Sequence, residues 1–168
     1  TLNDFPCADE LVGALRKHLP ASGNIRVLDK GAGSGDFASS LRKKMGADGN
    51  RLDITTIGLT HGLTKENRKM VNTERIGIGL NMSHRAKYHV IVDFVGEDWH
   101  LPKPLLKASI VKSVSLLEKG GELFTIIRIS DKSSEHNFSL REFDAWSESL
   151  IFEKDIAGVE YKMHRQGG

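Results

Sequence analysis

The segment VLDKGAGSGDF, residues 27–37, carries the residues whose types and spacing most readily suggest chemistry. Three glycines stand at alternate positions in it: Gly31, Gly33 and Gly35. Glycine adopts backbone angles that other residues resist, and without a Cβ the chain can approach a ligand closely. Asp36 begins a predicted helix, whose free N–H groups lie at the same loop. The segment therefore predicts a site in which a small molecule lies against bare backbone.

Glycine loops of this kind bind two main classes of cofactor in α/β proteins. The dinucleotide pattern G-x-G-x-x-G/A is met by Gly33, Gly35 and Ala38, but it also needs an acid at the end of the second strand. Here that strand ends TIGLTH, without an acid. Asp29 and Asp36 would also repel a pyrophosphate, so the loop favours a cationic ligand. A nicotinamide or flavin enzyme and a purely structural tight turn are the alternatives.

Hydrophobic periodicity and the positions of glycine and proline predict that strands and helices alternate along the chain. Helices are expected over residues 9–19, 36–45, 64–71, 102–118 and 139–149, and strands over residues 25–28, 54–59, 76–80, 88–92, 122–129, 151–153 and 159–164. The last two strands are expected to form an antiparallel hairpin. The fold class is thus α/β: a Rossmann-like, doubly wound sheet of seven mostly parallel strands, with helices on both faces. Ligands of such sheets bind outside the carboxyl ends of the strands, where the glycine loop would lie.

Length and composition predict one domain spanning residues 1–168. The chain is long enough to bury one core, and its 39% hydrophobic and 27% charged residues are ordinary for a globular protein. It begins with threonine and ends RQGG, which is consistent with a piece of a larger protein. No apolar run approaches the roughly 20 residues of a membrane span, and no targeting signal is visible. We therefore expect a cytoplasmic protein with no membrane partner.

The cysteine, histidine and charge content excludes several classes of site. Cys7 is the single cysteine, so the chain can form no internal disulfide and no cysteine-built metal site. The seven histidines lack metal-binding spacing with acids, and no metal site is predicted. Basic and acidic side chains nearly balance, 24 against 22, so a nucleic-acid partner would have to bind a local patch.

The stretch LDKGAGSG resembles motif I of the class I S-adenosylmethionine-dependent methyltransferases. The family pattern D/E-x-G-x-G-x-G is matched by Asp29 and the three glycines. In that family the glycines approach the methionine part and the ribose of the cofactor, and the acid orients the loop or the cofactor's amino group. The resemblance covers about residues 9–165 and implies S-adenosylmethionine as the cofactor. It also implies a seven-stranded sheet with a final antiparallel strand.

Residues on later strands are similar to those of RNA 2′-O-methyltransferases, such as the FtsJ-like ribosomal RNA enzymes and the flavivirus cap enzyme. Asp93 follows the fourth strand, Arg128 lies on the fifth and Glu160 on the last, while GLTHG, residues 58–62, also resembles the flavivirus pattern. The implied cofactor-binding residues are Asp29, Gly31, Ala32, Gly33, Ser34, Gly35, Asp36, Phe37, Thr60, His61, Asn81, Met82 and Asp93.

The resemblance also implies a set of catalytic residues. Asp93 would orient substrate and cofactor, and Arg128 and Glu160 would set the electrostatic field. Arg128 stands where the family has a lysine, and arginine, with a pKa above about 12, cannot serve as a base. Lys162, on the same strand face as Glu160, would then supply the base. The alternative role of Asp93 is that of a strand-end acid that caps the following turn.

The implied substrate is RNA, at a ribose 2′-hydroxyl of a viral cap or a similar structure. Neighbouring domains of a larger polyprotein or polymerase are implied as partners, and the sequence specifies no oligomeric state. Two other functions stay open. One is a catalytically incomplete methyltransferase-like module that binds cofactor or RNA, and the other is a methyltransferase for small molecules or proteins.

Overall fold

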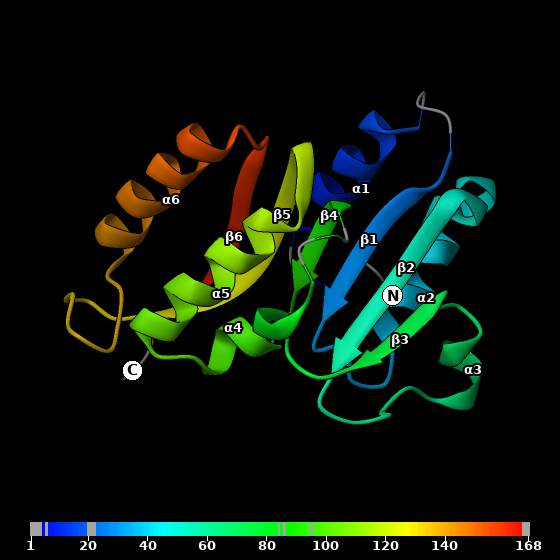
Figure 1. Cartoon of the computed structure of the whole chain (residues 1–168), viewed down its shortest axis with the longest axis horizontal. Helices are drawn as coiled ribbons and strands as arrows, with labels where there is room; N and C mark the ends of the chain where they lie inside the picture. The colour runs from blue at the N-terminus through cyan, green and yellow to red at the C-terminus, as the bar shows by residue number, and fades with distance from the viewer. Residues whose placement is uncertain are drawn as a thin grey trace.

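The computed structural model describes residues 5, 7–19, 23–83, 85, 87–94 and 96–165, the last four of these by their backbone only. Within them, six strands form one sheet in the order β3-β2-β1-β4-β5-β6 (Figure 1). The strands are β1 (Ile25–Lys30), β2 (Leu52–Gly58), β3 (Thr73–Ile76), β4 (Tyr88–Asp93), β5 (Leu117–Ile129) and β6 (Gly158–Arg165). The α-helices are α1 (Ala8–Lys17), α2 (Asp36–Met45), α3 (Lys65–Arg68), α4 (Glu97–His100), α5 (Lys103–Ser115) and α6 (Leu140–Lys154), with short 3-10 helices η2 (Gly46–Arg51) and η3 (Gly79–Asn81).

The predicted α/β, Rossmann-like class is confirmed, but the predicted C-terminal hairpin is wrong. Every neighbouring pair of strands in the described sheet is parallel, including β5 with β6. Residues 151–153, expected to be a strand, form the last part of α6, which buries Phe143, Ser147 and Leu150 at helical spacing. Because α6 leads from β5 to β6 without a strand in between, it serves as a crossover connection, and β6 runs parallel to β5. The described sheet therefore has six strands instead of seven.

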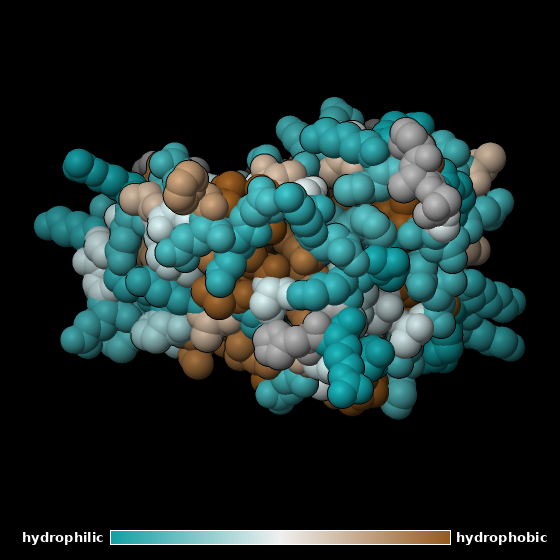
Figure 2. All heavy atoms as spheres, turned by 45° about the horizontal axis from the view of Figure 1, so that its top comes forward, coloured by the Kyte–Doolittle hydropathy of each residue, from teal (hydrophilic) through white to brown (hydrophobic). Residues whose placement is uncertain are grey.

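Two hydrophobic cores lie on opposite faces of the sheet, because successive residues of a strand point to opposite sides. Leu28 packs in the core beneath α5 and α6, whereas its neighbour Val27 packs in the core beneath α1 and α2. Figure 1 shows the corresponding layers, with α4, α5 and α6 on one side of the sheet and α2 on the other. Figure 2 shows apolar residues across the middle of one face, between hydrophilic side chains at both ends.

Two of the described helices, α3 and α6, begin at a side chain that accepts a hydrogen bond. The hydroxyl of Thr64 accepts a bond from the Asn67 backbone N–H and starts α3, and Ser139 does the same for α6 through the backbone N–H of Glu142. The predicted bounds of α2, residues 36–45, agree with the structure. In the described part of the chain, no helix has the length and apolar character needed to cross a membrane.

Candidate cofactor site

A cavity of about 460 Å³ lies at the carboxyl ends of β1, β2 and β3, next to the glycine loop. Residues from four segments line it: 31–33, 56–63, 74–80 and 96–101. The volume falls within the roughly 300–1,000 Å³ typical of small-molecule sites. Leu59, at the end of β2, is 76% exposed although it lines the cavity. The cavity thus has an apolar, solvent-facing rim at its β2 side.

The three loop glycines have different structural roles, although all have a positive φ, of 71°, 53° and 90°. A Cβ on Gly31 would lie 2.5 Å from the Cα of Gly96, and one on Gly35 would lie 2.8 Å from a methyl group of Leu63. A Cβ on Gly33 would meet nothing within 4 Å. Gly31 and Gly35 therefore permit close packing, and Gly33 is the position that offers bare backbone to the cavity.

The two acids that flank the loop do not line the cavity. Asp29 is buried, and burial raises its pKa to about 8, so its carboxyl group is neutral at pH 7. Asp36 is exposed and accepts a 2.9 Å hydrogen bond from the amide of Asn67. The carboxylates that do line the cavity are Glu74 and Glu97. Negative charge is present, as the sequence analysis expected, but other residues supply it.

Glu74 belongs to β3, where parallel pairing sets it beside Thr56 of β2. Its carboxylate lies 2.7 Å from Nδ1 of His61 and 3.5 Å from the guanidinium of Arg68. The hydrogen bond with His61, with a smaller contribution from Arg68, lowers the pKa of Glu74. The sequence analysis looked for an acid at the end of β2 and missed Glu74 on the adjacent strand. The segment TERI contains this acid, but its position beside β2 follows only from the parallel pairing of the two strands.

Glu97 connects two walls of the cavity. One of its carboxylate oxygens accepts a hydrogen bond from the backbone N–H of Gly79, in η3. The other lies 3.8 Å from the amine of Lys30. The helix α4, which carries Glu97, is thereby tied both to η3 and to the end of β1.

Lys30 is the centre of a buried polar cluster behind this wall, and its side chain is 1% exposed. The amine donates hydrogen bonds to the hydroxyls of Ser113 at 2.9 Å and Ser109 at 3.1 Å. It also lies 3.3 Å from a carboxylate oxygen of Asp93 and 3.3 Å from one of Asp98. Burial alone would lower the pKa of Lys30, but the charges of Asp98, Asp93 and Glu97 outweigh burial and raise it above its ordinary value. The lysine is therefore a cation held in the protein interior.

Asp93, a predicted catalytic residue, is part of this cluster and does not line the cavity. It is fully buried, and it accepts hydrogen bonds from the backbone N–H groups of Gly96 at 3.0 Å and Asp98 at 3.2 Å. Burial, and next the charge of Asp98, raise the pKa of Asp93 well above its ordinary value. These bonds are those of a strand-end acid that caps the following turn, and they hold Gly96 in the cavity wall.

The predicted cofactor-binding residues divide into two groups. Those that line the cavity are Gly31, Ala32, Gly33 and Thr60. Those that do not are Asp29, Ser34, Gly35, Asp36, Phe37, His61, Asn81, Met82 and Asp93. Met82 packs in the core and Asn81 is exposed, whereas the apolar residues Ile78 and Leu80 line the cavity in their place.

The predicted catalytic residues are not all brought together. Glu160 is exposed on β6 and pairs with Phe124 of β5, and the register pairs Lys162 with Ile126. The side chain of Lys162 lies outside the described part of the chain. Asp93 pairs with Thr125, which points to the opposite face of the sheet from Phe124. The structure thus separates Asp93 from the β6 positions.

Arg128, at the carboxyl end of β5, stacks on an aromatic ring. Its guanidinium carbon lies 4.9 Å from the ring centroid of Trp99. The two residues line a second, smaller cavity beside the first. The sequence analysis named Arg128, but the contact with Trp99 depends on how α4 folds back over β5.

Solved structures resemble this fold, although no protein-family model and no curated protein sequence matches the chain. The plantazolicin methyltransferase BamL, solved with a triazolic desmethylPZN analog and SAH, has a TM-score of 0.54 at 14% identity, over 88% of this chain and 69% of its own. AibC has a TM-score of 0.51 at 14% identity, over 90% of this chain and 38% of its own. TarJ of S. aureus has a TM-score of 0.50 at 14% identity, over 90% of this chain and 42% of its own. At these identities the likeness establishes the fold, and the chain spans less than half the length of AibC and TarJ.

Replacing Lys30 with methionine is expected to destabilise the fold strongly at pH 7. The variant keeps Asp93, Asp98 and Glu97 but loses their cation, and breaking a buried ion pair from one side costs about 3–5 kcal/mol. At pH 5 the loss should be smaller, because burial raises the pKa of Asp93 and its protonation removes charge from the cluster. Urea denaturation of both proteins at the two pH values measures the difference.

Lys17→Met is the matched control for this experiment. The Lys17 amine lies 3.3 Å from Glu122, but its side chain is 71% exposed. An exposed ion pair contributes at most about 1 kcal/mol, so this variant should stay close to the parent protein. Similar losses in the two lysine variants would contradict the role of the buried cluster.

Asp29→Asn is expected to change how stability depends on pH. Because the pKa of Asp29 is raised from 3.8 to about 8, its contribution is fully present below pH 4 and is lost as the pH rises towards 8. The free energy of unfolding of the asparagine variant should match that of the parent near pH 4. Above pH 4 it should exceed the parent's by up to about 1.4 kcal/mol more for each pH unit. Denaturation across pH 4–9 measures this gain, and the exposed Asp36→Asn variant should show none of it; parallel curves for Asp29→Asn and the parent would refute the prediction.

Proposed function

We propose that this chain is an S-adenosylmethionine-dependent methyltransferase domain, with the cofactor bound in the cavity at the glycine loop. The main observation in support of this proposal is that the bare backbone of Gly33 and the carboxylates of Glu74 and Glu97 line the same cavity, of about 460 Å³. The match of the loop to motif I and the fold shared with BamL, a methyltransferase solved with SAH, support the proposal.

The chemistry of the lining suits this cofactor. S-adenosylmethionine carries two cationic groups, a sulfonium and an ammonium, and Glu74 and Glu97 are the carboxylates that would balance them. The Gly33 backbone would hold the methionine part, and Ile78 and Leu80 would contact the flat adenine ring. When bound, the cofactor supplies an electrophilic methyl group. The protein's part is to hold the acceptor in line with it and to exclude water.

A nicotinamide dinucleotide is the second candidate ligand, because six parallel strands in the order 3-2-1-4-5-6 also form dinucleotide-binding folds. Two observations oppose it. Glu74 and Glu97 outnumber Arg75 in the lining and would oppose a pyrophosphate, and β2 ends without an acid for the ribose. S-adenosylmethionine therefore fits the lining better.

Calorimetry with S-adenosylhomocysteine and with NADPH tests the ligand. The parent protein is expected to bind the former and not the latter, and Gly33→Arg should abolish binding, because the arginine side chain would fill the cavity. Gly46→Arg is the matched control: Gly46 also has a positive φ, of 57°, and open space at its Cβ, but it lies outside the cavity. Binding of NADPH alone would overturn the proposal, as would binding unaffected by Gly33→Arg.

For the acceptor, we propose a ribose 2′-hydroxyl of RNA, in a viral cap or a similar structure, in the cytoplasm. The sequence likeness to RNA 2′-O-methyltransferases motivates this choice, and the Arg128–Trp99 stack is a combination that binds phosphate and base together. Lys162 would take the hydroxyl proton, and Glu160 would balance its charge. Neighbouring domains of a larger protein would complete the RNA surface.

Transfer of a tritiated methyl group to capped RNA tests the acceptor. Lys162→Met is expected to remove activity without loss of cofactor binding, whereas Lys154→Met, an exposed lysine at the end of α6, should leave it unchanged. Full activity of Lys162→Met would contradict the assignment of the base. Methyl transfer to a small molecule or a protein but not to RNA would replace this acceptor, and cofactor binding without any transfer would indicate a binding module.

A further inference from the structure

A second cavity, of about 210 Å³, adjoins the proposed cofactor cavity. His100 and Leu101 line both, so the two cavities are neighbours at the end of α4. The walls of the second cavity come from α4, the first turn of α5, the end of β5 and the loop before α6. A ligand here would lie next to whatever occupies the first cavity.

The charge of the second cavity differs from that of the first. Its polar and aromatic lining residues are Trp99, His100, Lys103, Arg128, His136, Asn137 and Phe138, and among the residues that the structure describes no aspartate or glutamate lines it. The Lys103 amine is already neutralised by Glu142, 2.6 Å away and outside the lining. The positive charge available to a ligand is therefore that of Arg128.

Arg128 has unused hydrogen-bonding capacity. In the part of the chain that the structure describes, its Nε is buried and has no hydrogen-bond partner. Its guanidinium carbon lies 4.9 Å from the ring centroid of Trp99, a contact made by the face of the guanidinium, whereas its N–H groups point outward in the plane. A buried donor without an acceptor is unfavourable, because it has lost its hydrogen bond to water. A carboxylate or phosphate meets this need, because its two oxygens accept from Nε–H and Nη–H together.

The cavity wall is held in place by hydrogen bonds. The backbone N–H of Lys103 donates to the carbonyl of His136 at 2.8 Å, and the Lys103 amine lies 5.5 Å from the ring centroid of Phe138. Ser133 also bonds to Glu142, the ion-pair partner of Lys103. The loop before α6 is thereby fixed to the start of α5, so the site is formed before a ligand binds.

We infer that the second cavity binds an oxyanion, carboxylate or phosphate, of the methyl acceptor, with Arg128 as its ligand. Trp99 fixes the guanidinium plane and offers a ring edge to a planar group beside the oxyanion. The acceptor atom then lies toward His100, which lines both cavities. The inference rests on the proposed function, because it names the substrate chemistry of the same enzyme.

Calorimetric titration of the protein saturated with S-adenosylhomocysteine tests this, with phenyl phosphate and benzoate as probes. At least one probe should bind, and Arg128→Met should weaken it about tenfold or more, since a charge-assisted bidentate contact is lost. Arg128→Lys should weaken it less, because lysine keeps the charge but not the planar fork. Preference for phenyl phosphate points to a phosphorylated acceptor such as a nucleotide, and preference for benzoate points to a carboxylic acid.

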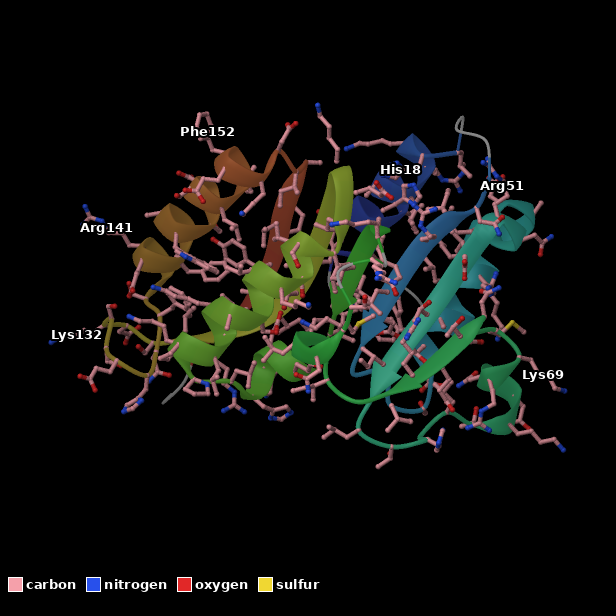
Figure 3. The ribbon with its side chains drawn as sticks, viewed as in Figure 1. His18, Arg51, Lys69, Lys132, Arg141 and Phe152 are labelled. Atoms are coloured by element: carbon pink, nitrogen blue, oxygen red, sulfur yellow. The ribbon has the colours of Figure 1, made fainter. Side chains whose placement is uncertain are left out.

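Arg141→Met is the matched control. Arg141 is an exposed arginine at the start of α6 whose side chain extends away from the molecule (Figure 3). It should leave probe binding unchanged, and thermal unfolding followed by circular dichroism checks that each variant is folded. Equal weakening by Arg128→Met and Arg141→Met would overturn the inference, as would no probe binding to protein that binds S-adenosylhomocysteine. Failure of the protein to bind S-adenosylhomocysteine at all would instead overturn the proposed function.

Discussion

The structure of the site depends on the amine of Lys30, a cation buried where the first strand ends. Desolvating one ammonium group is costly, and the surrounding carboxylates and serine hydroxyls offset that cost only while their geometry holds. The groups belong to β4, α4 and α5, so the requirement to satisfy one charge fixes three elements against β1. Glu97, which reaches both the cluster and the cavity, makes the electrostatics of the ligand site a consequence of this buried arrangement.

The two neighbouring cavities differ in the charged residues that line them, and this difference suits them to different ligands. Glu74, Glu97 and Arg75 are the charged residues that line the first cavity, whereas the described lining of the second has an arginine and no acid. In the proposed arrangement the first cavity favours a cationic donor and the second an anionic acceptor, and the two would lie next to each other at His100, which lines both cavities. The two cavities share one wall segment, α4 and the turn after it, and the other segments of each lining are different.

The sequence predicted the alternation of strands and helices, the position of the glycine loop at the carboxyl edge and the bounds of α2, because periodicity and glycine placement act locally. The prediction was wrong at residues 151–153, where a short apolar run suits a buried helix as well as a strand. Because of this error the last strand was expected to be antiparallel, whereas β6 is parallel to β5. Glu74 and the contact between Arg128 and Trp99 were not visible, because they arise from strand pairing and from a helix that folds back.

Asp29 and Lys30 show why a motif match locates a site without assigning its charges. They are consecutive residues of β1, so their side chains point to opposite faces of the sheet. Asp29 enters the layer beneath α1 and α2, where burial keeps it neutral at pH 7. Lys30 enters the layer of α4 and α5, where three carboxylates surround it. Asp29, the acid of the motif, is therefore uncharged at neutral pH. Lys30, between Asp29 and the first glycine, positions the charged residues of the wall that a ligand would contact.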